Sequence, residues 1–195
     1  MAMYLKQQGK SVILVDLDTV NPYFRSADFT QQLQKQGIEV LAPLYANTNL
    51  DIPALSAEIY SVFNRKDSTV IFDVGGDEDG AYALGRFSHL IEESGYDMLY
   101  VVNKFRYFTR EPSECVDLLR EIEAASRLKG SFIVNNSNLG QETTVQDVEN
   151  SVSFARDIST LTGLPLLCNT CKDDLPVTGD DYFKVSIYVK PPWEK

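Results

Sequence analysis

Cysteine and histidine are scarce in this chain of 195 residues, which has three cysteines and one histidine. Three cysteines are too few, and odd in number, for a disulfide framework, so we expect a reduced protein in the cytoplasm. No apolar run approaches the roughly 20 residues that span a bilayer. The opening run MAMYLKQQGK lacks the apolar core of a signal peptide. We therefore expect no membrane partner.

Cations are also in the minority, because 18 Lys and Arg stand against 28 Asp and Glu and the formal net charge is −10. Nucleic-acid surfaces need clustered cations that neutralise phosphates, so we expect no nucleic-acid partner. Hydrophobic residues make up 44% of the chain and charged residues 24%, as in globular proteins. The length suits one domain with a substantial core, and we predict a single domain over residues 1–195.

Short apolar runs alternate with amphipathic stretches along the chain. We expect strands at Ser11–Asp16, Ile38–Ala42, Thr69–Val74, Met98–Asn103, Phe132–Asn135 and Leu164–Cys168, and an edge strand over Phe183–Val189. We expect helices at Met1–Gln8, Ala27–Gln36, after a cap at Asp51, at Asp79–Glu93, at Glu111–Leu128, and after a capping box of Thr144 and Asp147. This alternation predicts an α/β fold with a mostly parallel sheet covered by helices on both faces. Ligands of such sheets bind beyond the carboxyl ends of the strands.

The run VIFDVGGDEDG is an apolar strand that ends in an acid, Asp73. A carboxylate at such a strand end can hold a water molecule of a hydrated magnesium ion. Gly75 and Gly76 would let the backbone approach a phosphate. The alternative is an ordinary strand-to-helix turn in which Asp77 or Asp79 caps the following helix.

The run VILVDLDTVNPYFR has the same character, with Asp16 at the strand end and Asp18 two residues later. Two carboxylates this close repel one another unless a cation or hydrogen-bond donors compensate. Asp18 could orient an attacking water molecule, and Arg25 could bind a phosphate through two hydrogen bonds. One alternative is a polar turn. Another is a dinucleotide site in which Asp16 holds a ribose hydroxyl, although no G-x-G-x-x-G precedes this strand.

Taken together, these motifs resemble the MinD/ParA/CobQ class of P-loop ATPases, also called the SIMIBI class. VILVDLDTVNPYFRS is followed about fifty residues later by VIFDVGGDEDGAYALGRF, and FIVNNSNLGQET fits the same pattern. The resemblance extends over nearly the whole chain. It implies ATP and Mg²⁺ as cofactors, a nucleotide-dependent homodimer, and an unidentified protein client.

The resemblance also implies roles for individual residues. Asp16 and Asp18 would belong to the strand end and the first switch region, with Asp18 positioning the hydrolytic water. Asp73 would be the Walker B acid, which holds Mg²⁺ through water. Gly75 and Gly76 would form the second switch, which senses the terminal phosphate. The remaining position is an asparagine after a late strand, Asn136, which would hydrogen-bond the adenine base.

The family's phosphate-binding loop, K-G-G-x-G-K-[ST], has no match in this sequence. Gly9-Lys10-Ser11 has similar letters but leads into a strand, whereas the motif should open a helix. Residues 1–9 instead resemble the end of the helix that follows this loop in the family. We therefore expect a member that starts about thirty residues late, without the phosphate cradle and without one interior strand.

Two explanations of this difference remain open. The chain could be an N-terminally truncated member, or a degenerate relative that serves as a non-catalytic binding module. An in-frame G-K-G-G-x-G-K-T ahead of Met1 would decide between them. In either case we expect no meaningful ATP hydrolysis, because phosphoryl transfer depends on positioning and charge stabilisation by the absent loop.

Two further groups of residues are less specific. Cys168 and Cys171 form a C-x-x-C, which is half of a zinc site. A metal would need a second pair of ligands, such as one from a symmetric partner chain, and we expect both cysteines to be structural or incidental. A basic cluster follows the strand that ends at Asn103, and aromatic residues flank it. We expect a solvated loop there, with an interface between subunits as the alternative. Its members are Lys104, Arg106 and Arg110, with Tyr100, Phe105, Tyr107 and Phe108.

Overall fold

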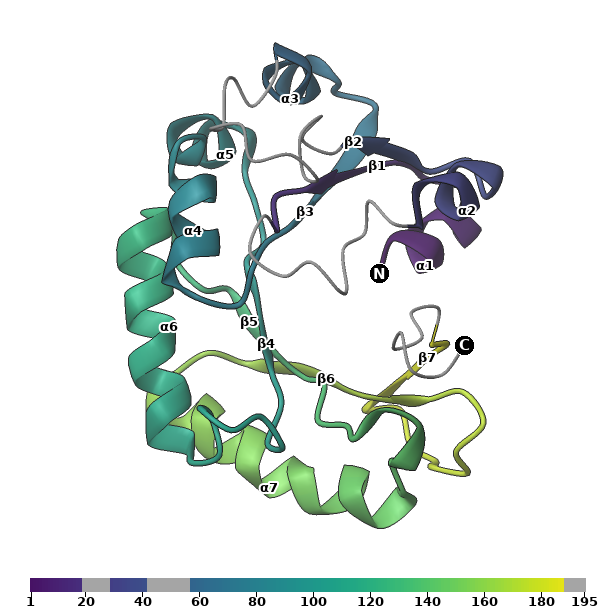
Figure 1. The fold of residues 1–195 in the computed structure, drawn as a ribbon, viewed down its shortest axis with the longest axis vertical. Coiled ribbons are helices and arrows are strands. Elements are labelled where there is room, and N and C mark those ends of the chain that lie inside the picture. The colour runs from purple at the N-terminus through teal and green to yellow at the C-terminus, as the bar shows by residue number, and fades with distance from the viewer. Residues whose placement is uncertain (19–28, 42–56, 188–195) are drawn as a thin grey trace, which may run out of the picture. The chain divides into compact units, whose positions relative to one another are not determined.

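The computed structural model describes residues 1–18, 29–41 and 57–187. The chain divides into two compact units, Met1–Ser94 and Gly95–Lys195, and each is described by itself. Each unit contains one sheet, and every strand pairing in both sheets is parallel. The prediction of an α/β fold with parallel strands is therefore confirmed, whereas the strands form two sheets where one was expected (Figure 1).

The first unit has a three-stranded sheet in the order β2-β1-β3. Its strands are β1 (Ser11–Asp16), β2 (Glu39–Leu41) and β3 (Ser68–Asp73). Its helices are α1 (Ala2–Gln7), α2 (Thr30–Lys35), α3 (Ala57–Ser61), the short 3-10 helix η2 (Val62–Asn64), α4 (Glu78–Gly85) and α5 (Ser88–Ser94).

The central strand β1 is buried on both faces, as its continuous apolar run predicts. On one face, Val12 and Leu14 pack with side chains from α1 and α2. On the other face, Phe72 of β3 stacks on Phe63, with ring centroids 5.9 Å apart, and Phe63 stacks in turn on Phe87. Side chains alternate between the faces of a strand, so these two clusters hold the sheet from both sides.

The second unit has a four-stranded sheet in the order β4-β5-β6-β7. Its strands are β4 (Leu99–Val102), β5 (Phe132–Asn135), β6 (Leu166–Lys172) and β7 (Tyr182–Val185). Its helices are α6 (Pro112–Ser126), the 3-10 helix η3 (Gly140–Glu142) and α7 (Val145–Thr162). Helix α7 packs against β5, β6 and α6, and β7 is an edge strand as expected (Figure 1).

Local sequence signals explain where α7 begins and ends. Thr144 is its N-cap, with its hydroxyl accepting from the backbone N–H of Asp147 at 3.2 Å. The Asp147 carboxylate accepts in return from the backbone N–H of Thr144 at 2.9 Å, which completes the expected capping box. The helix ends at Gly163, whose φ of 75° is readily adopted only by glycine.

Several predicted boundaries are confirmed and others are wrong. Strands β1 and β5 have the predicted bounds, residue for residue. The expected helix over 79–93 is two helices, α4 and α5, because Phe87 turns fully into the core between them. Strand β6 is longer than predicted and includes Cys171. The predicted cap Asp51 lies outside the described residues.

No helix in the described part of the chain is both long enough and apolar enough to cross a membrane.

Candidate functional site

The two acid-tipped strands lie side by side in the first unit. Strands β1 and β3 pair in parallel, and Asp16 lies opposite Asp73 in the register. The chain just beyond β1 remains bound to β3, because the Leu17 backbone N–H donates to the Asp73 carbonyl oxygen at 2.8 Å. Both acids are therefore at the carboxyl edge of one sheet, where ligands of parallel sheets bind.

Asp18 continues this edge by two residues. Its backbone N–H donates to Oδ1 of Asp16 at 3.0 Å. This hydrogen bond stabilises the Asp16 carboxylate, which is only 1% exposed. A Cβ atom added to Gly75 would lie 3.4 Å from Oδ1 of Asp18, so the Asp18 carboxylate lies against the loop that follows β3. The structure thus brings Asp16, Asp18, Asp73 and Gly75 to one place.

In the loop after β3, Gly75 lies directly against Gly80 in the first turn of α4. The importance of Gly80 was not predicted from the sequence. A Cβ atom at Gly80 would lie 2.6 Å from the Cα of Gly75 and 2.8 Å from its N and O, which no side chain could tolerate. Asp77 is the N-cap of α4, and its carboxylate accepts from the Gly80 backbone N–H at 2.9 Å. Glycine has a poor helix propensity, so its presence in the first turn of a helix was the one signal in the sequence for this contact.

The turn interpretation of this segment is confirmed for one residue, because Asp77 caps α4 while Asp79 lies in its first turn. Gly76 lies exposed in the same turn. Arg25, the predicted phosphate ligand, lies outside the described residues. A cap at Asp77 leaves the carboxylates of Asp18 and Asp73 to be explained separately.

The donor set at this edge suits a hard cation such as Mg²⁺. Magnesium in proteins is usually held by one or two carboxylates, with water molecules and phosphate oxygens completing the octahedron. Asp18 and Asp73 supply oxygen donors of this kind at the carboxyl edge. Among the described residues, no group of three or more His, Cys, Asp or Glu side chains could hold a metal ion alone.

The second unit presents amides at its own carboxyl edge. Asn136 follows β5, and its backbone N–H donates to the Val102 carbonyl at 2.8 Å. Its Oδ1 accepts from the hydroxyl of Thr170 at 2.5 Å, and its carbonyl accepts from Nδ2 of Asn138 at 2.7 Å. The Asn136 amide thus has a set orientation at the end of the sheet.

A buried amide lies directly behind it. Asn135 is 1% exposed, and its Nδ2 donates to Oγ of Ser151 at 2.9 Å and to Oδ1 of Asn169 at 2.8 Å. Its Oδ1 accepts from the hydroxyl of Ser137 at 2.7 Å and from the backbone N–H of the same residue. This network ties the loop after β5 to α7 and β6. An apolar strand that ends in two asparagines was the signal for it.

The C-x-x-C residues lie within β6 rather than after it. Residues three apart on a strand point to opposite faces, so the two thiols diverge. Cys171 is 3% exposed and packs with Val148 and Val177, while Cys168 is half-buried. The two sulfur atoms cannot jointly ligate one ion in this geometry, which supports the structural role that the sequence indicated.

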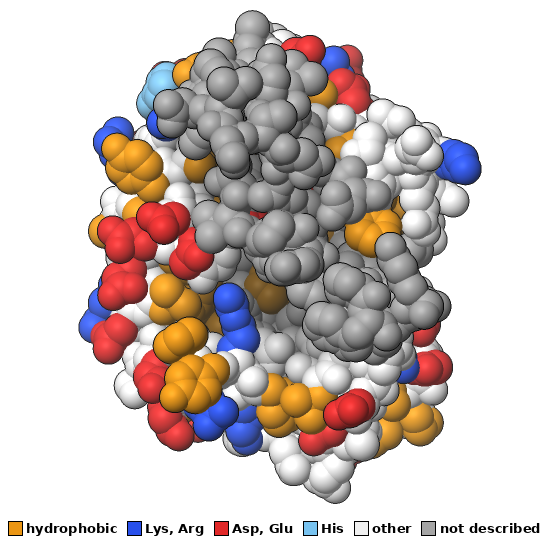
Figure 2. All heavy atoms as spheres, in the orientation of Figure 1, with side chains coloured by type: hydrophobic (Ala, Val, Ile, Leu, Met, Phe, Trp, Pro, Cys, Tyr) orange, Lys and Arg blue, Asp and Glu red, His pale blue; other side chains and the backbone are white. Residues whose placement is uncertain are grey.

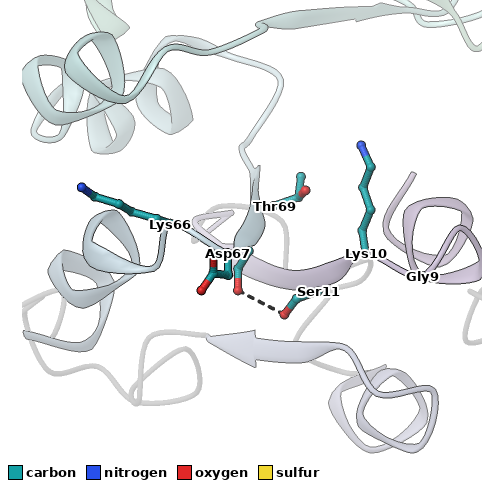
Figure 3. A pocket seen from close by; sticks show the side chains of 7 residues that line it. Gly9, Lys10, Ser11, Lys66, Asp67 and Thr69 are labelled. Carbon is teal, nitrogen blue, oxygen red and sulfur yellow. Dashed lines mark hydrogen bonds between the residues drawn. The ribbon is translucent and has the colours of Figure 1, made fainter.

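A shallow hollow lies at the opposite, amino edge of the first sheet (Figure 3). It has a volume of about 330 Å³, and Ser11 and Ser68 join across its floor through their hydroxyls at 3.1 Å. In Figure 3 the side chains of Lys10 and Lys66 extend in different directions from the two sides of the hollow and do not converge. The letters Gly-Lys-Ser at its rim lead into β1, as expected, so they do not form a phosphate-binding loop.

These features define the class of the protein. It is an α/β protein with two parallel sheets flanked by helices, consistent with a Rossmann-like fold, and the first sheet carries acids at its carboxyl edge. No protein-family model matches the chain, and no curated protein matches it.

Proposed function

We propose that this chain is a MinD/ParA-like ATP-binding protein, a nucleotide-dependent dimer switch with a protein client. The observation that carries the proposal is the register of β1 and β3. That register places Asp16 and Asp73 side by side and brings Asp18 against the loop that begins at Gly75. This arrangement is what a magnesium–triphosphate site beyond a parallel sheet requires.

The proposed roles follow the geometry. Asp73 would hold a water molecule of Mg²⁺, and Asp18 would orient the water that attacks the terminal phosphate. The loop at Gly75 and Gly76 would respond to that phosphate, and the close approach of Gly75 and Gly80 would pass a shift of the loop to α4. Magnesium itself supplies neutralisation of phosphate charge.

Other parts of the chain would complete the binding of the nucleotide. Asn136, oriented by Thr170, would hydrogen-bond the adenine base. Arg25 would bind a phosphate.

Hydrolysis by this 195-residue chain should stay near the uncatalysed rate. The sequence contains no K-G-G-x-G-K-[ST] loop, whose backbone amides and lysine would bind the phosphates. A preorganised cradle of that kind supplies most of the charge stabilisation in phosphoryl transfer. Magnesium-dependent turnover that is abolished by Asp73→Asn would contradict this expectation.

Ligand-induced stabilisation tests the binding proposal. We expect ATP with Mg²⁺ to raise the melting temperature, and NAD to leave it unchanged. A ligand present at 100 times its Kd adds about 2.7 kcal/mol to the free energy of unfolding. Asp73→Asn should remove the magnesium-dependent part of this shift. The matched control is Asp79→Asn, an exposed acid in the first turn of α4, which should keep it. An equal shift in Asp73→Asn and the parent chain would sink the assignment.

A non-catalytic relative with the same fold is the second candidate, and the missing phosphate-binding motif favours it. It predicts no melting shift with any nucleotide. The dinucleotide alternative is disfavoured on geometry, because Asp16 is 1% exposed and its Oδ1 already accepts from the Asp18 backbone. A buried carboxylate of this kind cannot reach a ribose hydroxyl.

A further inference from the structure

The loop between β4 and α6 is held firmly at both ends. Oδ1 of Asn103 accepts from the backbone N–H of Phe105 at 3.0 Å and from that of Asn138 at 3.3 Å. At the far end Thr109 is buried, and its carbonyl accepts from the Cys115 thiol at 3.6 Å. The residues between these anchors therefore have a defined conformation.

Between the anchors, two aromatic rings face solvent. Phe108 is 83% exposed and Tyr107 is 71% exposed. Their rings contact each other edge to face, with centroids 5.0 Å apart, and the Arg110 guanidinium lies 5.0 Å from the Tyr107 ring centroid. The aromatic flank expected from the sequence is thus divided, because Tyr100 is buried and Phe105 half-buried. The two rings in contact therefore form a small exposed apolar patch with a cation beside it, the kind of surface that marks an interaction site.

The charge around these rings is opposite in sign to that of the chain. Lys104, Arg106 and Arg110 have no carboxylate within ion-pair distance among residues 1–18, 29–41 and 57–187. The nearest acids along the chain are Glu111, the N-cap of α6, and Glu114 in its first turn. The Glu114 carboxylate accepts from the backbone N–H of Glu111 at 2.9 Å. The whole chain carries −10. On the face drawn in Figure 2, Lys and Arg side chains are interspersed with acidic and hydrophobic ones.

We propose that Arg106, Tyr107, Phe108 and Arg110 form a docking surface for an acidic segment of another protein that presents an apolar side chain. We call these four residues the aromatic–arginine surface. Tyr, Phe and Arg are the residue types enriched at protein interfaces and at their energetic centres. The apolar side chain would cover the two rings, and carboxylates would pair with the arginines, which have no ion pair within the described part of the chain.

Charge argues against two other occupants of this surface. In a two-fold contact with a second copy, the same patch meets itself, so Arg106 and Arg110 would face their counterparts and repel. A nucleic-acid strand could stack on the rings, but its affinity would rest on many phosphate contacts, and this four-residue surface offers two cations, Arg106 and Arg110. An acidic peptide satisfies both the rings and the cations over a small area.

A peptide array tests this proposal with defined probes. It holds 12-residue peptides built from Asp, Glu, Phe, Leu and Gly, beside the same peptides with Lys in place of every acid. We expect the labelled full chain to bind acidic members and not their lysine counterparts. Binding measured in solution should weaken as salt rises from 50 to 300 mM, because exposed charge pairs are screened. Phe108→Ala and the double variant Arg106→Glu, Arg110→Glu should each weaken it tenfold or more.

The matched control is the pair Tyr82→Ala and Arg86→Glu, an exposed aromatic and an exposed cation elsewhere on the chain. This pair should bind the peptides like the parent chain. Circular dichroism should show all variants folded, since every changed side chain is exposed.

Three results would overturn the proposal. The first is that the chain binds acidic and lysine peptides equally, or binds neither kind. The second is that a thymidine 15-mer binds more tightly through the same residues. The third is self-association of the chain that Phe108→Ala abolishes. None of these results depends on whether the chain binds ATP.

Discussion

The carboxyl edges of the two sheets are built alike and differ in chemistry. In the first unit the strands end in carboxylates, Asp16 and Asp73, with Asp18 close behind. In the second unit β5 ends in an amide, Asn135, which is buried and hydrogen-bonded to the buried Asn169 opposite it in β6. The backbone is arranged in the same way at both edges, because neighbouring parallel strands end in register. Strand β1 ends beside β3, and β4 ends beside β5, so the loops that follow leave from one edge of each sheet.

The two edges therefore suit different kinds of ligand. Acids at a strand edge accumulate negative charge, which a cation or backbone donors must compensate. Amides both donate and accept, so they can satisfy one another completely, as the Asn135 network does. Charge chemistry is therefore expected at the first edge, and directional recognition at the second.

The largest expected effect comes from breaking the amide network. Asn135→Leu leaves Ser137, Ser151 and Asn169 without their shared partner inside the core. We expect a loss of about 3 kcal/mol or more in the free energy of unfolding, because each buried polar group left without a hydrogen-bond partner costs about 1–3 kcal/mol. Urea melts measure this loss. Asn150→Ala, at an exposed asparagine on α7, should cost under about 0.5 kcal/mol. Equal losses would mean that the network contributes nothing special.

The next effect concerns the buried thiol of Cys115, on α6 of the second unit. Burial, helped by the Glu114 charge, raises the pKa of the Cys115 thiol from 9.0 to about 11. At neutral pH its thiolate fraction should be about a hundredfold below that of an ordinary cysteine, so alkylation by iodoacetamide should be slower by at least that factor. Cys168, which is half-buried, should react first. Mass spectrometry of timed samples measures both rates.

The same thiol makes stability depend on pH in a defined direction. A pKa raised in the folded state favours the protonated form, so its contribution is complete below about pH 9 and is lost as pH rises toward 11. The free energy of unfolding should therefore fall over this window. The fall should be smaller in Cys115→Val, and an identical pH profile in that variant would count against the assignment.

A smaller effect probes the tight contact at the acidic edge. Gly→Ala in a helix normally stabilises by about 1 kcal/mol. Gly80→Ala should instead destabilise by about 2 kcal/mol, because its Cβ would meet the backbone of Gly75 at 2.6 Å. Gly130→Ala is the matched control, since the closest atom to its Cβ would be the end of the Leu164 side chain, at 2.8 Å, which can move. Thermal melts that rank Gly130→Ala as the worse variant would refute this reading of the edge.

The smallest effect concerns a helix start in the second unit. Thr144→Ala removes the hydroxyl that accepts from the Asp147 backbone and should cost about 1 kcal/mol. The hydroxyl and backbone of Thr144 hold the pKa of the Asp147 carboxyl below its ordinary value. That part of the stability is present above the ordinary pKa and lost as pH falls. NMR titration of Asp147 should show its pKa rising in Thr144→Ala and unchanged in Thr160→Ala, at the other end of α7.

Much of the fold could be predicted from local patterns. Ser11–Asp16 and Phe132–Asn135 are strands with the predicted bounds, and the capping box at Thr144 forms as expected. These succeeded because apolar runs and caps depend on neighbours along the chain. The break between α4 and α5 was missed because the core contacts of Phe87 override helical propensity there.

Some features of the candidate site could also be predicted from the sequence, and others could not. The sequence showed that acids end two apolar runs, and the roles proposed for them remain predictions. Gly80 and Asn135 were missed, since the importance of each comes from a partner in another part of the fold rather than from its neighbours.

Composition and periodicity act locally, so the amino-acid sequence was enough to predict the alternation of strands and helices, the acids at two strand ends and the negative charge of the chain. The three-dimensional fold was needed to show that Asp16 lies beside Asp73, that Gly80 contacts Gly75, and that two aromatic rings face solvent beside Arg110. The register of strands and the packing of loops are set by contacts between segments far apart in the chain, and no local pattern encodes them.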